Sequence, residues 1–123
     1  MKALLSTILL FAASSAYSVE HLDVIKVKIK PECSVAEYVA IAEDFNESWG
    51  KANGYHAWVA VPIQSEDLYT VWWMGTSANA ATYGAAWDTW RDAQSDPESV
   101  EAKLWARFLA CSDNAGRWGY DLY

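Results

Sequence analysis

The chain has 123 residues, and its nine basic and 16 acidic side chains give a net charge of −7 at neutral pH. A field of that sign repels phosphate backbones and anionic lipid, which makes nucleic acid and membrane surfaces poor partners. Eight Trp and seven Tyr are many for so short a chain. The charge leaves a small or neutral ligand, or another protein, as a possible partner. Surplus Trp is typical of interfaces and ligand pockets, and a purely structural role for most of these residues is the favoured alternative.

The first eighteen residues are typical of a secretory signal peptide. Lys2 precedes an apolar run of Leu, Ile, Phe and Ala, and small residues follow it. The apolar run has about a dozen residues, fewer than the roughly 20 that a membrane-spanning helix needs. We therefore expect residues 1–18 to be removed and the mature protein to be secreted or periplasmic. Residues 19–123 are then expected to form a single domain.

The chain contains two cysteines, Cys33 and Cys111. Export would place both in an oxidising compartment, where a lone pair usually forms a disulfide. We predict that they are bonded to each other. A catalytic thiol is the less favoured alternative, because neither His21 nor His56 is near a cysteine in the sequence and an oxidised sulfur is no nucleophile.

Residues 22–30 alternate between an apolar face, with Ile25 and Val27, and a face that carries Lys26 and Lys28. This pattern predicts a half-buried strand. In an acidic protein, a basic strand face near aromatic side chains could attract an anionic aromatic ligand. Solvated lysines that discourage edge pairing are the favoured alternative.

The next segment contains the signals of a helix and a hairpin. Ser34 and Glu37 have the spacing of a capping box, and the helix that they start is expected to end at Gly54. Alternating patterns then predict strands at 55–63 and 68–75. The short polar turn between these two strands favours a hairpin.

The last segment contains two predicted helices and a strand. A helix capped by Ser77 is expected to run for about four turns, and a second helix follows a capping-box spacing that begins at Ser95. Asn114 and Gly116 are expected to end that helix. The aromatic residues 118–123 then form a short final strand.

The order of these elements is strand, helix, strand, strand, helix pair, strand. It matches the split β-α-β plan of an α+β fold, in which an antiparallel four-stranded sheet has its helices on one face. In this topology the start of the first helix and the end of the last helix lie at one edge of the sheet. Cys33 and Cys111 would meet there, so the predicted disulfide is geometrically reasonable.

At this level the chain resembles the ferredoxin-like dimeric α+β barrel superfamily, which contains antibiotic-biosynthesis-type monooxygenases, stress-responsive barrel proteins and NIPSNAP-like proteins. The resemblance covers nearly the whole mature chain. It rests on the element order, on the Lys-Ile-Lys-Pro sequence at 28–31, on the hairpin, and on residues 72–77 that lead into the broken second helix. The resemblance implies a homodimer paired sheet to sheet, with a small ligand held between sheet and helices or inside the barrel.

The sequence also departs from some members of that superfamily. Haem-degrading members have a Trp on the third strand, as Trp72 or Trp73 would be here, but they also use an Asn on the first strand and a His on the second helix. This sequence has neither, and no cofactor is expected. Cofactor-free monooxygenases of the superfamily use polar and aromatic groups of the pocket, for which the candidates here are His56, Trp58, Trp72, Asn79 and Tyr83.

We predict one aromatic pocket where the hairpin meets the helix that leaves it, with His56 near its mouth. Trp72 and Trp73 are neighbours on a strand and must face opposite sides, so only one of them can belong to the pocket. The predicted ligand-binding residues are Lys26, Lys28, His56, Trp58, Trp72, Trp73, Tyr83 and Trp87. A metal site built from His21, Asp23 and His56 is disfavoured, since two histidines are few for such a site, and no metal is expected.

Three functions are compatible with these features. The leading hypothesis is a non-enzymatic exported protein, dimeric and barrel-forming, that binds a small apolar or aromatic molecule. The second is a cofactor-free enzyme of the monooxygenase type. The third is a Trp-rich surface module that binds carbohydrate or a protein partner.

Overall fold

The computed structural model describes residues 19–123, and the predicted signal peptide lies outside the described residues. None of the helices in this range is long and apolar enough to cross a membrane. The elements in chain order are β1 (Glu20–Ile29), α1 (Val35–Phe45), the π-helical turn η1 (Asn46–Gly50), the 3-10 turn η2 (Lys51–Asn53), β2 (Tyr55–Ala60), β3 (Thr70–Ser77), α2 (Ala80–Ala93), α3 (Val100–Cys111) and β4 (Ser112–Leu122).

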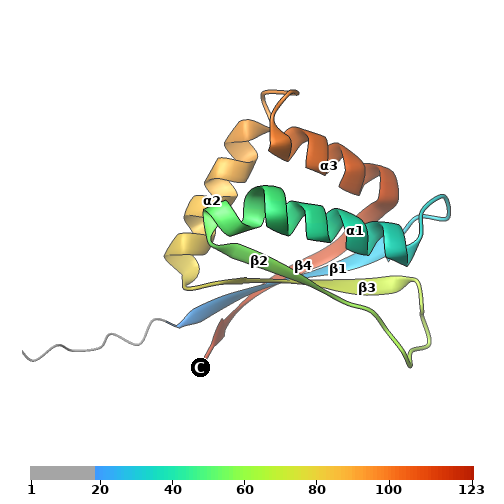
Figure 1. The fold of residues 1–123 in the computed structure, drawn as a ribbon. Helices are drawn as coiled ribbons and strands as arrows, with labels where there is room; N and C mark the ends of the chain where they lie inside the picture. The colour runs from blue at the N-terminus through green and yellow to red at the C-terminus, as the bar shows by residue number, and fades with distance from the viewer. Residues whose placement is uncertain (1–18) are drawn as a thin grey trace, which may run out of the picture.

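The four strands form one antiparallel sheet in the order β2-β3-β1-β4. All three α-helices cover one face of this sheet, and the other face carries no helix (Figure 1). This is the ferredoxin-like split β-α-β arrangement, and the predicted fold class is confirmed.

Strand β1 has the predicted alternation. Ile25, Val27 and Ile29 are buried toward the helices, whereas Lys28 on the opposite face is exposed. Asp23 shares the inward face and is only 1% exposed. A carboxyl group so deeply buried needs partners, and they define the site described below.

The first helix begins as the sequence predicts. Glu37 N donates to Ser34 Oγ over 3.2 Å, and Ser34 N donates to Glu37 Oε2 over 2.8 Å, which completes the capping box. The chain stays helical beyond α1 through η1 and η2. This helical segment ends at Gly54, whose φ of 65° lies in the left-handed region that favours glycine.

Both later helices begin at other residues than predicted. Ser77 is the last residue of β3, where it pairs with Tyr55 and His21, and Asn79 caps α2 instead. Ser99 caps α3, whereas Ser95 Oγ donates to the Asp92 carbonyl at the end of α2. Ser77 is therefore engaged in sheet pairing and Ser95 in the end of α2, and neither caps the helix to which the spacing assigned it.

Strand β4 is longer than predicted, because it begins directly after α3. Asn114 and Gly116 lie within the strand and do not end the helix. A register shift leaves Ala115 as an extra residue between the pairs Val27–Asn114 and Lys26–Gly116. The bulge explains how Asn114 and Gly116, two residue types common in turns, can lie within a strand.

The predicted disulfide is present. Cys33 precedes α1 and Cys111 ends α3, and their Cα atoms are 5.1 Å apart. The bond therefore joins the start of α1 to the end of α3.

Candidate functional site

A cavity of about 470 Å³ lies between the helices and the sheet. Its volume is within the usual range for small-molecule sites. Five of the chain's eight Trp contribute to its walls: Trp49, Trp73, Trp87, Trp90 and Trp105. The walls are therefore mainly aromatic.

The cavity has a buried floor and an open mouth. Trp73 of β3 and Trp90 of α2 belong to the buried core, and Phe45 of α1 contacts both rings edge-on. By contrast, Trp87 of α2 and Trp105 and Leu109 of α3 are between 36% and 48% exposed. The mouth thus lies where the exposed sides of α2 and α3 meet, and these apolar side chains form part of its rim.

One end of the cavity is polar because Arg117 of β4 lies there beside Asp23. Arg117 Nε donates to Asp23 Oδ1 over 2.8 Å, and Arg117 Nη2 donates to Oδ2 over 2.7 Å. Tyr55 Oη donates a third hydrogen bond to the same carboxylate over 2.9 Å. Asp23 is thereby fully engaged beneath the cavity, and its negative charge is balanced by the guanidinium.

Gly75 of β3 makes room for this arrangement. A Cβ atom at that position would lie 1.6 Å from Tyr55 Oη, so only glycine lets the phenol lie across the strand. Trp73 Nε1 donates to the same phenol oxygen over 2.7 Å. The local sequence of β3 therefore sets the position of the Tyr55 hydroxyl over Asp23.

Arg117 and Tyr83 are the polar groups that line the cavity at this end. Arg117 Nη2 also donates to Tyr83 Oη over 3.0 Å, and the guanidinium carbon lies 4.3 Å from the centre of the Trp87 ring. Burial alone would lower the pKa of Arg117, but the hydrogen bonds and charge of Asp23 outweigh that effect and raise it. The guanidinium is thus held in place by an anion on one side and an aromatic face on the other.

The Tyr83 hydroxyl remains protonated in neutral solution. Burial raises the pKa of Tyr83, and the negative charge of Asp23 raises it further. The ring of Tyr83 packs against the ring of His21 with a centroid distance of 4.4 Å and an interplanar angle of 33°. The Tyr83 hydroxyl is therefore fixed in position, and because it accepts from Arg117, its own proton is not donated to Arg117.

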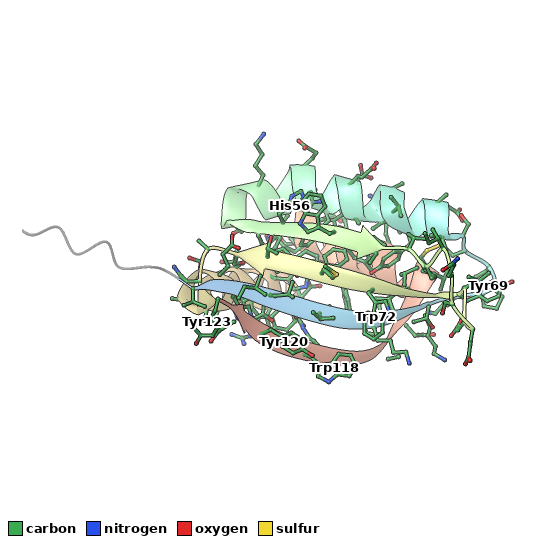
Figure 2. The ribbon with its side chains drawn as sticks, turned by 90° about the horizontal axis from the view of Figure 1, so that it is seen from below. His56, Tyr69, Trp72, Trp118, Tyr120 and Tyr123 are labelled. Atoms are coloured by element: carbon green, nitrogen blue, oxygen red, sulfur yellow. A yellow bond between two sulfur atoms is a disulfide. The ribbon has the colours of Figure 1, made fainter. Side chains whose placement is uncertain are left out.

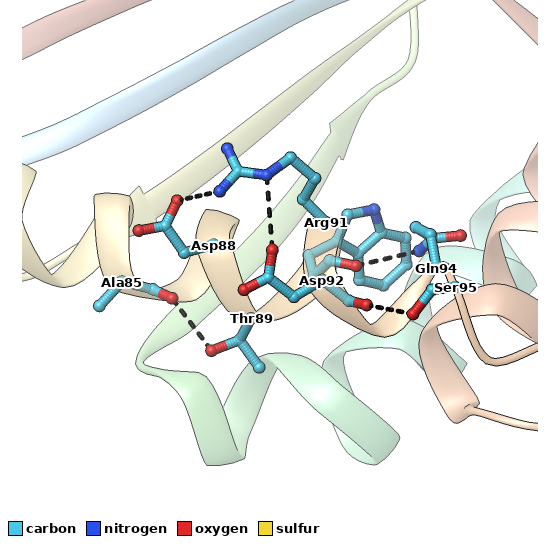
Figure 3. A network of polar contacts seen from close by, with 8 residues as sticks. Ala85, Asp88, Thr89, Arg91, Asp92, Gln94 and Ser95 are labelled. Carbon is cyan, nitrogen blue, oxygen red and sulfur yellow. Dashed lines mark hydrogen bonds and ion pairs between the residues drawn. The ribbon is translucent and has the colours of Figure 1, made fainter.

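The polar side chains farther along α2 are paired with one another (Figure 3). Arg91, which also lines the cavity, bonds Asp88 over 2.7 Å and lies 3.6 Å from Asp92. Gln94 Nε2 donates to the Trp90 carbonyl. These groups stabilise the helix and leave no uncompensated positive charge at this part of the cavity wall.

Three of the predicted ligand-binding residues lie together in this cavity: Trp73, Tyr83 and Trp87. Trp72 faces the other way, as neighbours on a strand must. The question of which Trp belongs to the cavity is thereby answered in favour of Trp73.

The other five predicted residues lie on the outer, helix-free face of the sheet, away from the cavity: Lys26, Lys28, His56, Trp58 and Trp72. Figure 2 shows Trp72 and His56 on this face. The structure therefore divides the predicted set between two surfaces. The division follows from strand alternation, which sends odd-numbered residues of β1 and β2 inward and even-numbered ones outward.

The residues of the disfavoured metal site do not assemble. Asp23 is occupied by Arg117, His21 packs against Tyr83, and His56 points outward. Among residues 19–123 no group of three His, Cys, Asp or Glu side chains could hold a metal ion.

Sequence reasoning missed the polar end of the cavity. The sequence did contain a signal for Asp23, since this residue lies on the otherwise apolar inward face of β1. Arg117 had none, because it lies in a segment predicted to follow a helix stop. Trp49, Trp90 and Trp105 were identified only as part of the Trp surplus.

The outer face of the sheet carries a second aromatic surface. One row of paired residues crosses all four strands, formed by Trp58, Met74, Val24 and Trp118. Trp72 lies beside it, 6.0 Å from Trp118 between ring centroids. We call these five residues the outer aromatic face; Trp58, Trp72 and Trp118 are exposed by 38% to 59%.

Comparison with known proteins identifies the fold alone. No protein-family model matches the chain, and no curated protein matches it significantly. A conserved protein of unknown function from Bacteroides thetaiotaomicron, described as a possible oxidoreductase, aligns with a TM-score of 0.55 and 12% identity over 87% of this chain and 100% of its own.

Two further solved structures are more distant. A dabb family protein with a ferredoxin-like fold from Mesorhizobium loti gives a TM-score of 0.49 at 11% identity over 86% of this chain and 97% of its own. A dimeric protein of unknown function with a ferredoxin-like fold from Bacteroides fragilis gives 0.44 at 10% identity over 83% and 93%. The strand order of the sheet and the alignment with a TM-score of 0.55 confirm the resemblance predicted from the sequence at the level of the fold.

Proposed function

We propose that the protein is an exported small-molecule-binding protein that holds an apolar or aromatic ligand in the cavity between its helices and its sheet. The observation that carries this proposal is the cavity itself, whose walls contain five Trp and whose mouth opens between α2 and α3. A rigid aromatic cavity gains free energy from apolar contact without ordering flexible side chains.

Binding is favoured over oxygenase chemistry by the state of the polar groups. An oxygenase without a cofactor needs a base that reaches its substrate. Asp23 accepts three hydrogen bonds and is 1% exposed, so it does not reach the cavity. Asp113, the carboxylate that does line the cavity, is highly exposed and lies 3.7 Å from Lys30. No histidine lines the described cavity.

Export is part of this proposal. The amino-terminal sequence is typical of a signal peptide, and the Cys33–Cys111 disulfide is a bond that persists in oxidising compartments. We place the protein in the periplasm or outside the cell.

Homodimerisation through the outer aromatic face is also part of the proposal. Monomeric proteins rarely leave a large contiguous apolar patch in water, and a row of apolar side chains across a whole sheet suits a self-complementary twofold contact. Lys26 lies beside Trp72 on this face, so an acidic group of the second copy has to meet it if the contact excludes water.

The test is native mass spectrometry of the protein purified from its own host, followed by titration with the neutral fluorescent probe N-phenyl-1-naphthylamine. The proposal predicts a co-purifying small molecule that the probe displaces in a one-to-one ratio per chain. A protein that carries no molecule and leaves the probe emission unchanged would contradict it.

A further inference from the structure

The polar end of the cavity determines which aromatic molecules fit it. Asp23 and the Tyr55 hydroxyl lie beneath the surface, and their hydrogen bonds are directed at Arg117, at each other and at Trp73. They offer nothing to a ligand. At this end of the cavity a ligand meets Arg117 and Tyr83, and Asn114 lines the cavity farther along the inward face of β4.

Arg117 and Tyr83 both present donors. Among residues 19–123, the hydrogen bonds of Arg117 use Nε and Nη2, so the two protons of Nη1 are uncommitted. Tyr83 Oη accepts from Arg117, which leaves its own proton free to donate. A ligand atom placed between these two donors has to accept hydrogen bonds from them, as a carbonyl oxygen does, whereas an ammonium group can only donate and finds no partner there.

The charges at this end already balance. Arg117 is neutralised by a two-point pair with Asp23, and Arg91 is paired with Asp88 and Asp92 (Figure 3). The chain as a whole carries a net charge of −7. An anionic ligand would lose its hydration and lie close to the Asp23 carboxylate without gaining an unpaired cation.

We infer that the cavity selects an uncharged planar aromatic ligand that bears an acceptor oxygen, such as an aryl ketone, with that oxygen at Arg117 and Tyr83 and the rings among the Trp walls. This inference rests on the proposed function, and it adds the acceptor and the absence of charge.

Three probes of nearly equal shape test it by equilibrium dialysis against the purified disulfide-bonded protein: 2-ethylnaphthalene, 2-acetylnaphthalene and 2-naphthoate. The ketone is expected to bind about tenfold more tightly than the hydrocarbon, because it adds a hydrogen bond to a charged donor. The carboxylate is expected to bind more weakly than the ketone.

The variant Tyr83→Phe removes one donor and keeps the ring. It is expected to weaken ketone binding by at least about threefold and to leave 2-ethylnaphthalene unchanged. Tyr120→Phe, on an exposed residue of the sheet, is the matched control and should alter neither affinity. The unchanged hydrocarbon affinity also verifies that the variant is folded.

The outcomes are distinguishable. Equal affinity of ketone and hydrocarbon, or tighter binding of 2-naphthoate than of the ketone, would overturn the inference and leave the proposed function standing. Failure of all three probes to bind up to their solubility would overturn the proposed function and the inference with it.

Discussion

Arg117 and Asp23, which are 94 residues apart in the chain, form a two-point ion pair whose donor-to-acceptor distances are 2.8 and 2.7 Å. The pair joins the edge strand β4 to the central strand β1 on the face that the helices cover. It both stabilises the sheet and forms the polar end of the cavity.

Replacing Arg117 is expected to be costly. Arg117→Ala leaves a buried carboxylate without its cation, which we expect to lower the free energy of unfolding by about 3 kcal/mol. The matched control is Arg107→Ala, since Arg107 also pairs with an Asp at 2.7 Å but in an exposed position. Its expected cost is below about 1 kcal/mol. Urea unfolding of both variants measures the contrast, and equal losses would contradict the role given to the pairing of Arg117 with the buried Asp23 carboxylate.

Gly75 is expected to be intolerant of a methyl group. Gly75→Ala displaces the Tyr55 phenol from Asp23 and Trp73, and we expect a loss of about 2 to 4 kcal/mol. Gly84→Ala, in the middle of α2 with no atom within 4 Å of its Cβ position, should stabilise the protein by about 0.5 to 1 kcal/mol. Thermal unfolding of the two variants compares them directly. A neutral Gly75→Ala would show that Tyr55 is not fixed as described.

The disulfide is expected to stabilise the fold strongly. It joins residues 78 apart in the sequence, which corresponds to roughly 4 to 5 kcal/mol in the chain-entropy account. The double variant Cys33→Ser/Cys111→Ser should therefore unfold at a much lower urea concentration than the oxidised protein. Reduction of the unmodified protein provides the control and should reproduce the effect. A shift of the midpoint that corresponds to less than about 1 kcal/mol would argue against this contribution.

Alkaline solution is expected to destabilise the protein through its buried tyrosines. Burial raises the pKa of Tyr38 above its usual value near 10, so the folded state keeps the proton when the unfolded chain loses it. The contribution of this group to stability is complete below about pH 10 and decreases as the pH rises further. Tyr38→Phe should reduce the loss of stability between pH 8 and pH 11 in urea unfolding. An unchanged loss would contradict the assignment.

Much of the fold could be predicted from local patterns. The strand faces followed from alternation, because each is buried on one side only, and the start of α1 followed from the reciprocal bonds of Ser34 and Glu37. The disulfide followed from the pairing of two cysteines in the expected topology. The starts of α2 and α3 could not be predicted in this way, since Ser77 and Asn79 offered similar capping signals before α2, as did Ser95 and Ser99 before α3. Sheet pairing engages Ser77 and the end of α2 engages Ser95, which local spacing does not encode.

The site was less accessible to sequence reasoning. Trp73, Tyr83 and Trp87 could be placed near one another because a strand and the helix leaving it are neighbours. The pairing of Asp23 with Arg117 depends on the register of strands at opposite ends of the chain, which local pattern does not encode. Trp58 and Trp72 were also assigned to the cavity, although their positions in the alternation of β2 and β3 place them on the outer face.

Trp72 and Trp87 provide the most direct test of the account, because both are 38% exposed and they lie on opposite sides of the sheet. Probe titration and light scattering are measured on Trp87→Ala and Trp72→Ala. We predict that Trp87→Ala weakens binding of N-phenyl-1-naphthylamine by at least about tenfold and leaves the dimeric mass unchanged, whereas Trp72→Ala keeps the affinity and shifts the mass toward the monomer. Loss of probe binding in Trp72→Ala with full binding in Trp87→Ala would contradict the claim that the cavity under the helices is the ligand site.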